Sequence, residues 1–323
     1  MSTHPKVSVL IPSYNYAHYL DEAIQSVIDQ TFTDFELVIV DNHSTDNTEE
    51  VVQKYLTDSR IRYYQNPTNL GLGGNWNKCL EYARGKYIKY LCADDKFHPR
   101  LLEQYVAVME ENPNVSFVTC FRQQFGTKTN IVEVPFIGMH DGMKTLYHTL
   151  NTKGWLGEPS VVMIRRENIK LGKFNPNYTW LIDYDMWIRH LTVGDCYVIP
   201  EPLIFIRNHE GQITKMVMRN FINHFEEYQL CKILQKSNPY NIDLSGIDIR
   251  QVVKKKAAKC AKAMYKALPS LHKKEERSLF LKAFKIAFKE RIIFSTFIDL
   301  FTGKSARLEK ESYQVIHHEQ LLA

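Results

Sequence analysis

Residues 86–99 read Lys-Tyr-Ile-Lys-Tyr-Leu-Cys-Ala-Asp-Asp-Lys-Phe-His-Pro. The Tyr, Ile and Leu residues predict a strand, Asp94 and Asp95 come at its end, and Pro99 suits the first turn of a new helix. Ligands of open α/β sheets bind beyond the carboxyl ends of the strands. Two carboxylates there can hold a hard divalent cation, which in turn binds phosphate oxygens. They can also cap the following helix and pair with its basic side chains, and this stretch alone leaves both readings open.

The elements before this stretch alternate between strand and helix. Apolar runs and helical spacing predict strands at 7–12, 35–40 and 61–65, and helices at about 19–30, 46–56 and 74–83. Because the connections are short, this order implies an α/β fold with a largely parallel sheet and right-handed crossovers. Such a half-domain commonly binds a nucleotide.

The regular alternation stops beyond the next helix and strand, at about 101–111 and 115–120. The pattern then predicts a polar hairpin at about 123–133, a short helix at 143–150, a strand at 159–164 and a helix at about 183–191. Short strands follow at 197–200 and 203–207. From about residue 218 onward it is helical throughout. We therefore expect a catalytic domain at 1–215 and a helical, basic region at 216–323.

Composition excludes several classes of protein. A hydrophobic fraction of 44% and a charged fraction of 24% fit a soluble globular chain. The six cysteines form no CxxC pair, which argues against a disulfide framework or a zinc cluster and favours a reducing compartment. Because the predicted first strand begins at Val7 and no run of about 18 apolar residues occurs, we expect neither a signal peptide nor a membrane span. We expect a cytoplasmic protein.

Seven short motifs occur in a fixed order along residues 5–215. They are Val-Ser-Val-Leu-Ile-Pro-Ser-Tyr-Asn (7–15), Gln-Thr-Phe-Thr-Asp-Phe-Glu (30–36), Val-Asp-Asn-His-Ser-Thr-Asp-Asn-Thr (40–48), Asn-x-Gly with a later Asn (69–77), Ala-Arg-Gly-Lys-Tyr-Ile (83–88), Ala-Asp-Asp (93–95) and Asp-Tyr-Asp-Met-Trp-Ile-Arg (183–189). Together they resemble the family 2 glycosyltransferases, which have the GT-A fold. Nothing comparable covers the last hundred residues.

The resemblance implies a nucleotide-binding set at the first two strand ends, the glycine loop and the acidic turn. Its members are Pro12, Tyr14, Asn15, Asp41, Asn42, Gly71, Asn77 and Asp94. Many family members carry two consecutive aspartates where this chain has Asp41-Asn42. A carboxylate only accepts hydrogen bonds, whereas an amide also donates, so the base stays open, with a slight preference for uridine.

The resemblance also implies a metal site. Asp95 corresponds to the direct ligand and Asp94 to a contact with the ribose or the metal's surroundings, while Cys92 stands where many members carry another Asp. His209 can complete the metal site or contact the phosphates, and Arg207 can add positive charge. Such ligands suit Mg²⁺ or Mn²⁺ equally.

Asp183 aligns with the family's general base, which removes the proton of the acceptor hydroxyl in a single, inverting displacement. Asp185 is the rival base, but two positions on a helix turn a side chain by about 200°. Trp155 and Glu158 are expected on the acceptor or donor-sugar side, together with Asp185 and Arg207.

These residues predict an inverting, metal-dependent glycosyltransferase that moves a sugar from a nucleotide to a glycan or lipid-linked acceptor in surface polysaccharide synthesis. The alternative is a catalytically silent nucleotide-binding or scaffold protein with the same fold. A Rossmann dehydrogenase is disfavoured because the first turn, residues 12–15, is Pro-Ser-Tyr-Asn and not glycine-rich.

The C-terminal region concentrates positive charge, with 17 Lys and Arg against 5 Asp and Glu over residues 250–310. Leu281, Phe284, Phe288 and Ile292 recur there at helical spacing beside lysines. Basic amphipathic helices bind anionic membranes, at about 1 kcal/mol per basic residue. Packing on the body of the protein with a solvated basic face, or a homo-oligomer contact, is the other reading. Nucleic acid is disfavoured because no binding module accompanies the charge.

Overall fold

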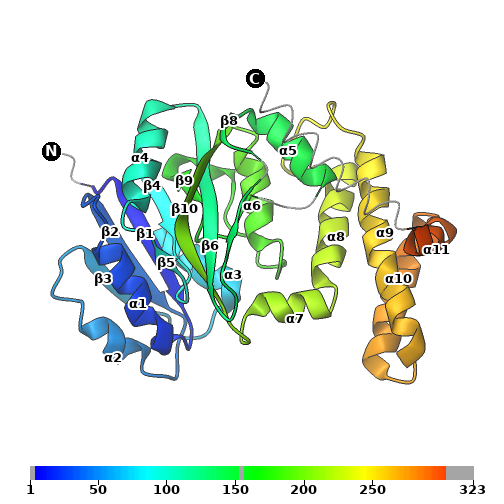
Figure 1. Ribbon diagram of the computed structural model, residues 1–323, viewed down its shortest axis with the longest axis horizontal. Coiled ribbons are helices and arrows are strands. Elements are labelled where there is room, and N and C mark those ends of the chain that lie inside the picture. The colour runs from blue at the N-terminus through cyan, green and yellow to red at the C-terminus, as the bar shows by residue number, and fades with distance from the viewer. Residues whose placement is uncertain (1–3, 135, 153–155, 303–323) are drawn as a thin grey trace. The chain divides into compact units, whose positions relative to one another are not determined.

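The structure is a computed structural model that describes residues 4–134, 136–152 and 156–302 (Figure 1). The chain forms two compact units. The first comprises Met1–Leu146, Gly154–Asn177 and Ile182–Glu210, and the second comprises Tyr147–Lys153, Tyr178–Leu181 and the chain from Gly211 onward. The two short segments of the second unit that lie before residue 215 have no counterpart in the boundary expected from sequence.

Strands of the first unit form one mixed sheet (Figure 1). They are β1 (Val7–Ser13), β2 (Phe35–Asp41), β3 (Ile61–Gln65), β4 (Tyr87–Tyr90), β5 (Lys96–Phe97), β6 (Val115–Gly126), β7 (Asn130–Val132), β8 (Gly138–His140), β9 (Met163–Arg165) and β10 (Asp195–Asn208). Their order is β3-β2-β1-β4-β9-β6-β10-β5, with β7 beside β6 and β8 beside β10. The predicted parallel half, β3-β2-β1-β4, is confirmed.

The helices begin and end near the predicted positions in the first half of the chain. They are α1 (Ala17–Ile28), α2 (Thr48–Gln53), α3 (Gly71–Tyr82), α4 (Leu101–Glu111), α5 (Gly142–Asn151), α6 (Ile182–His190), α7 (Ile213–Arg219), α8 (Ile222–Lys236), α9 (Ile249–Ala267), α10 (Lys274–Lys289) and α11 (Ile293–Thr302), with short 3₁₀ turns η1 (Arg166–Leu171) and η2 (Leu268–Ser270).

Helices cover both faces of the sheet because its central strands are apolar on both sides. Val9 and Ile11 of β1 face one way and share a core with Leu20 of α1 and Tyr105 of α4. The opposite face carries an aromatic cluster drawn from β4, α3, α6 and the segment before α6, namely Tyr90, Trp76, Trp187 and Phe174. This layering brings α3 and α6, which carry predicted site residues, to the same side.

Several predicted strand boundaries were wrong. The strand predicted at 159–164 is Met163–Arg165, and the one predicted at 115–120 continues to Gly126. The strand of residues 86–93 ends at Tyr90, so Cys92, Asp94 and Asp95 lie in the turn after it. The segments 197–200 and 203–207 form the single strand β10, whose pairing with β6 shifts register between Ile199 and Pro202. A proline at a shift is expected, because it cannot donate a ladder hydrogen bond.

The second unit is helical, with α9 at its centre. One face of α9 is buried, including Val253, Cys260 and Met264. Lys256 is also inside, where its Nζ donates to the carbonyl of Thr152 at 2.8 Å and pairs with Glu227 at 3.0 Å. None of the helices in the described residues combines the length and the apolar character needed to cross a bilayer.

Candidate active site

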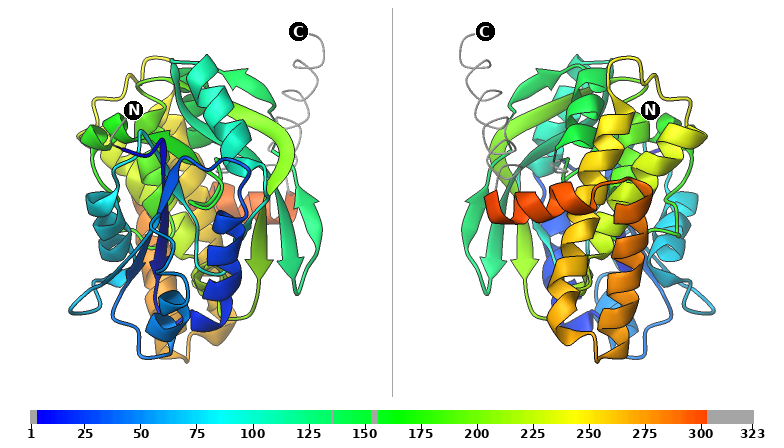
Figure 2. Two further views of the ribbon diagram at one scale, coloured as in Figure 1. Left: turned by 90° about the vertical axis from the view of Figure 1, so that its left-hand side faces the viewer. Right: turned by 90° about the vertical axis from the view of Figure 1, so that its right-hand side faces the viewer.

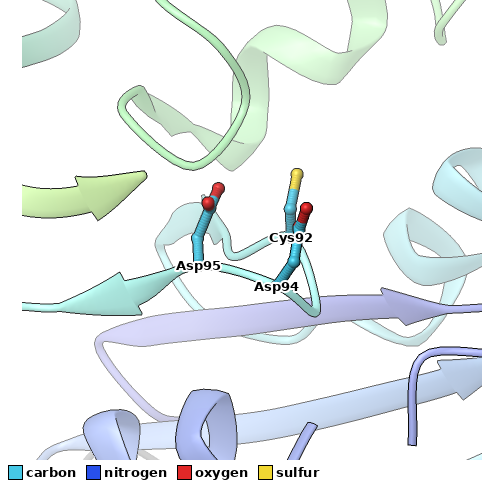
Figure 3. A group of neighbouring side chains, drawn as sticks. All are labelled: Cys92, Asp94 and Asp95. Carbon is cyan, nitrogen blue, oxygen red and sulfur yellow. The ribbon is translucent and has the colours of Figure 1, made fainter. Parts of the chain in front are cut away.

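The turn after β4 gathers three donor groups at one point. The ligand atoms of Cys92, Asp94 and Asp95 all lie within 4.8 Å of one another, and the three side chains point to the same side of the turn (Figure 3). The backbone N–H of Asp95 donates to the carbonyl of Cys92 at 3.0 Å, which closes the turn. The acidic pair predicted from sequence is therefore a compact cluster at the carboxyl end of a central strand.

Asp95 is held from two sides. Its Oδ1 accepts from the backbone N–H of Arg207 at 3.0 Å, and its Oδ2 accepts from the hydroxyl of Ser160 at 2.6 Å. The side chain is only 5% exposed. A carboxylate offers about four lone-pair positions, so these two bonds fix its orientation and leave room for a cation.

Arg207 braces the same turn. Its Nε donates to the carbonyl of Asp94 at 3.0 Å, and its Nη2 donates to Glu22 at 3.0 Å. The guanidinium lies 4.5 Å from the ring centroid of Tyr19 and 4.4 Å from that of Phe125. These stacking contacts and hydrogen bonds fix Arg207 beside the acidic turn. The sequence analysis expected it only to add positive charge.

His209 lies beside Asp94, with Nε2 3.1 Å from Oδ2 of Asp94. Its ring is also 5.2 Å from that of Tyr19, measured between centroids. The structure thus brings the predicted ligand His209 to the acidic turn, on the Asp94 side.

The donor set fits a hard divalent cation. Burial, followed by the charge of Asp94, raises the pKa of Asp95 well above its usual range. Burial and the two carboxylates likewise raise the pKa of the Cys92 thiol. The charge of Asp94 disfavours the ionised form of Asp95, and a bound cation would offset that cost. Two carboxylates and one imidazole are acceptable to Mg²⁺ or Mn²⁺.

Residues at the end of β1 tie the first two strand ends together. The backbone N–H of Asn15 donates to the hydroxyl of Ser44 at 2.8 Å, and its Oδ1 accepts from the N–H of Thr45 at 2.8 Å. Pro12 is half-buried, and Tyr14 is 43% exposed. Of this group, Tyr14 therefore offers a ring that a base can stack on.

Asp41 closes β2 and is buried, with donors around both carboxylate oxygens. Oδ1 accepts from the N–H and hydroxyl of Ser44, and Oδ2 accepts from Tyr63 Oη and Gln65 Nε2, both at 3.1 Å. Its contacts orient the loop after β2.

The side-chain amide of Asn42 both donates and accepts hydrogen bonds. Its Nδ2 donates to Asn69 Oδ1 at 2.8 Å and to the carbonyl of Gly71 at 3.3 Å. Its Oδ1 accepts from the N–H of Leu70 at 2.8 Å and from Asn66 Nδ2 at 3.1 Å. An aspartate here would place an oxygen against two acceptors, so the amide suits this loop. A contact of Asn42 with the nucleotide stays a prediction.

Replacing Asn42 with aspartate is expected to destabilise the protein by about 3 kcal/mol. The buried carboxylate cannot donate the two hydrogen bonds that the amide nitrogen makes, and it places an oxygen against both acceptors. Urea unfolding of both proteins measures the difference. Asn114→Asp, at an exposed position, is the control and should change stability by less than about 0.5 kcal/mol. Equal stability of the Asn42→Asp variant and the native protein would contradict the assigned role.

The start of α3 approaches the start of α6. A Cβ added to Gly73 would lie 2.9 Å from Cδ1 of Ile182 and 3.0 Å from the Cα of Pro176, so a larger residue there would force these neighbours to shift. Gly71 begins α3 with φ +72°. Asn77 pairs with both backbone groups of Phe174, each at 2.9 Å. Asn77 thus holds the segment that leads to α6, and a nucleotide contact for it stays a prediction.

The two candidate bases have different environments. Asp183 is partly exposed in the first turn of α6, and its Oδ1 accepts from the N–H of Tyr184 at 2.6 Å. Asp185 is fully buried and pairs with Arg189 at 3.0 Å. The structure therefore keeps Asp185 inside the protein and leaves Asp183 as the accessible carboxylate of the pair.

Helix α6 contacts, through Trp187, the segment whose Ser160 bonds to Asp95. Residues four apart lie on one helix face, and Trp187, four after Asp183, donates from Nε1 to the carbonyl of Gly157 at 3.1 Å. Glu158, the next residue, pairs with Arg122 at 3.3 Å. Ser160, whose hydroxyl donates to Asp95, follows two positions later. Trp155, expected on the acceptor or donor-sugar side, lies outside the described residues.

Sequence reasoning missed Lys89 and Ser160 behind the acidic turn. Lys89 is fully buried and donates to the carbonyls of Ser160 and Val162. Burial lowers the pKa of Lys89 to about 7. A lysine inside an apolar strand was the one available signal, since such a residue needs a specific internal partner.

Glu226 of α8 was also missed. Within the second unit its buried carboxylate accepts three backbone N–H groups, those of Thr179 and Trp180 at 2.8 Å and of Leu181 at 2.9 Å. These residues directly precede α6, so Glu226 fixes the chain that leads into Asp183. No local pattern predicts such a contact, because the partners are about 46 positions apart.

Glu226→Gln should lower the catalytic rate about tenfold while nucleotide affinity stays unchanged, because an amide nitrogen would oppose the N–H donors and loosen the entry to α6. Glu227→Gln is the matched control, since Glu227 is the neighbouring residue and pairs with Lys256 instead. Steady-state kinetics and nucleotide titration separate the two effects. Equal rates for both variants would argue against a positioning role.

Comparison with known proteins identifies the family. Residues 8–172 match the model of "Glycosyl transferase family 2". An uncharacterized glycosyltransferase of Methanocaldococcus jannaschii is 34% identical over 227 residues, which are 68% of this chain and 78% of that protein. The chain belongs to glycosyltransferase family 2, as its motifs predicted, and it is a glycosyltransferase by family and fold.

Other relatives extend the comparison. A putative teichuronic acid biosynthesis glycosyltransferase of Bacillus subtilis is 40% identical over 108 residues, 33% of this chain and 43% of that protein. S. aureus TarS 1-349 in complex with UDP-GlcNAc superposes with a TM-score of 0.66 at 19% identity, covering 86% of this chain and 79% of that one. The mannosyltransferase PcManGT from Pyrobaculum calidifontis, in complex with GDP-Man and Mn²⁺, gives 0.55 at 17%, covering 91% and 88%. These two structures show the shared GT-A fold.

Proposed function

We propose that the protein is an inverting, metal-dependent glycosyltransferase that transfers a sugar from a nucleoside-diphosphate sugar to a glycan or lipid-linked acceptor. The observation that carries this proposal is the carboxylate cluster of Asp94 and Asp95 at the end of β4, in a chain of this family. The UDP-GlcNAc and GDP-Man bound to the two structural neighbours support a nucleotide-sugar donor. The teichuronic acid relative supports a role in surface polysaccharide synthesis.

Asp183 acts as the general base in this reaction. It takes the proton of the acceptor hydroxyl as that oxygen attacks the anomeric carbon. The bond from the anomeric carbon to the diphosphate oxygen breaks at the same time, and its electron pair leaves with the nucleoside diphosphate. A single displacement from the opposite side inverts the anomeric configuration. Asp183 lies in the first turn of α6, close to the positive end of the helix dipole.

We assign Asp94, Asp95 and His209 to a divalent cation, Mn²⁺ or Mg²⁺. Such an ion, when bound, neutralises charge on the leaving diphosphate. Arg207 and Ser160 hold the carboxylate of Asp95 in place for it. Tyr14 stacks on the base, and Glu158 borders the acceptor side. Residues 1–215 carry the catalysis in this assignment.

A thermal-shift experiment with UDP and GDP, each with and without Mn²⁺, tests this proposal. A nucleotide that binds the folded state raises the melting temperature, and we expect the larger rise with Mn²⁺ present. The protein should also hydrolyse a matching nucleotide sugar slowly. Nucleotide binding without hydrolysis of any donor would favour the catalytically silent alternative, and binding of NAD without a metal effect would favour a dehydrogenase.

A further inference from the structure

Helix α10 turns its largest apolar side chains outward. The residues it buries are small, Ala283 and Ala287, whereas Leu281, Phe284 and Phe288 are 54%, 37% and 69% exposed. A helix that only completes a core buries its large apolar side chains and exposes its polar ones. α10 therefore packs on its own unit through alanines and presents a row of large apolar groups to its surroundings.

Helix α11 adds to this exposed apolar surface. Phe294, Phe297 and Ile298 are 84%, 48% and 60% exposed. The helix is nevertheless anchored within the second unit, because Thr296 is buried and Tyr265 Oη of α9 donates to the carbonyl of Ile293 at 2.9 Å. Figure 2 shows α9 and α10 side by side, with α11 running across them. The exposed rings thus belong to a fixed element.

Basic side chains accompany the apolar row. Lys282, Lys285 and Lys289 each follow one of the exposed apolar residues of α10 by one position and are exposed themselves. The sequence from 277 to 289 contains no acidic residue. The next residue, Glu290, pairs with Lys232 at 2.8 Å and accepts a hydrogen bond from Tyr228 Oη at 2.8 Å. Lys282 Nζ also lies 4.1 Å from the ring centroid of Phe225, and the charge of Lys289 acts on nearby Glu290. The surface therefore combines apolar rings with a net positive charge, of which Lys285 is the member without such a neighbour among the contacts described.

We propose that this surface docks on an anionic lipid bilayer. We call the exposed apolar and basic residues of these two helices the α10–α11 face. They are Leu281, Phe284, Phe288, Phe294, Phe297, Ile298, Lys282, Lys285 and Lys289. Its rings enter the boundary between headgroups and acyl chains, and its ammonium groups lie among the lipid phosphates. This docking goes beyond the proposed transferase reaction and does not depend on it.

The charge pattern favours a lipid surface over a second copy of this chain. Two copies meeting through the face would bring their lysines together without acidic partners, which is unfavourable. The basic stretch 250–310 includes the helices α9 and α10, which differ in what they expose. Helix α9 buries apolar residues, among them Val253, Cys260 and Met264, and its exposed lysines include Lys254 and Lys255, which have no large exposed apolar side chains beside them. The docking role therefore falls to α10 and α11.

Co-sedimentation of the full chain with lipid vesicles tests the proposal. We expect strong binding to phosphatidylcholine vesicles containing about 30% phosphatidylglycerol and weak binding to phosphatidylcholine alone. The double variant Phe288→Ser/Phe294→Ser should lower the partition coefficient on anionic vesicles by about a hundredfold, roughly tenfold per ring. The triple variant Lys282→Gln/Lys285→Gln/Lys289→Gln should abolish the preference for anionic vesicles.

The control is Ile131→Ser/Met139→Ser, which removes apolar side chains of the first unit that are 54% and 43% exposed. It should bind vesicles like the unchanged protein. Because all these positions are exposed, each variant should keep its melting temperature, which confirms folding. Full vesicle binding by the phenylalanine variant would overturn the proposal. So would an unchanged protein that ignores vesicles but forms a dimer, by light scattering, that the phenylalanine variant does not form.

Discussion

Replacing Asp183 with asparagine is expected to lower kcat for sugar transfer by about 10³-fold, because the amide cannot take the proton of the acceptor hydroxyl. The affinity for the nucleoside diphosphate should stay within about twofold of the original, since the change lies away from the nucleotide-binding loops. Steady-state kinetics with any accepted donor and acceptor, together with titration of the nucleotide, measure both quantities. The acid limb of the pH–rate profile should also disappear in the variant.

Asp185→Asn is the informative comparison for this variant. It removes the buried partner of Arg189, which lies 3.0 Å away, and should cost about 3 kcal/mol of stability. At a temperature where both variants are folded, the Asp185 variant should still show the acid limb of the profile. If the Asp185 variant lost that limb and the Asp183 variant kept it, the two roles would have to be exchanged.

Replacing Asp95 with asparagine is expected to weaken Mn²⁺-dependent binding of the nucleoside diphosphate by about 10²-fold, because the cation loses a charged oxygen ligand. Stability without metal should stay the same or rise. The reason is that Asp95 is buried next to Asp94, which raises the pKa of Asp95 and makes its ionised form costly in the free protein. Calorimetric titration and thermal unfolding in a chelator measure the two effects separately.

Glu22→Gln is a suitable control for the Asp95 variant. Glu22 is exposed, and its contacts among the described residues near the site are with Arg207 and Lys96, so nucleotide affinity with Mn²⁺ should change by less than about threefold. Should Asp95→Asn bind nucleotide with Mn²⁺ as tightly as the unchanged protein, the metal assignment would fail.

Local sequence was sufficient for the order of elements in the first half of the fold. The apolar runs of β1 and β2 are buried on both faces, and their continuous pattern identifies strands between helices. The same reasoning located Asp94 and Asp95 at a strand end, where parallel sheets bind ligands. It could not locate the end of that strand at Tyr90, because Leu91, Cys92 and Ala93 are as compatible with a strand as the residues before them.

Contacts between distant residues were decided by the tertiary structure. Glu226 reaches the chain before Asp183, Ser160 reaches Asp95, and Asn42 bonds a loop that begins more than twenty positions later. A single sequence shows the donors and acceptors but not which of them meet.

Helices α9 and α10 show the same difference between what the sequence determines and what the tertiary structure decides. Sequence by itself determined that α9 and α10 are amphipathic and positively charged, because helical periodicity and charge are local properties. Only the packed structure decided that α9 buries an apolar face while α10 exposes Phe284 and Phe288. Burial depends on what the rest of the chain places against a helix face, and periodicity carries no information about that partner.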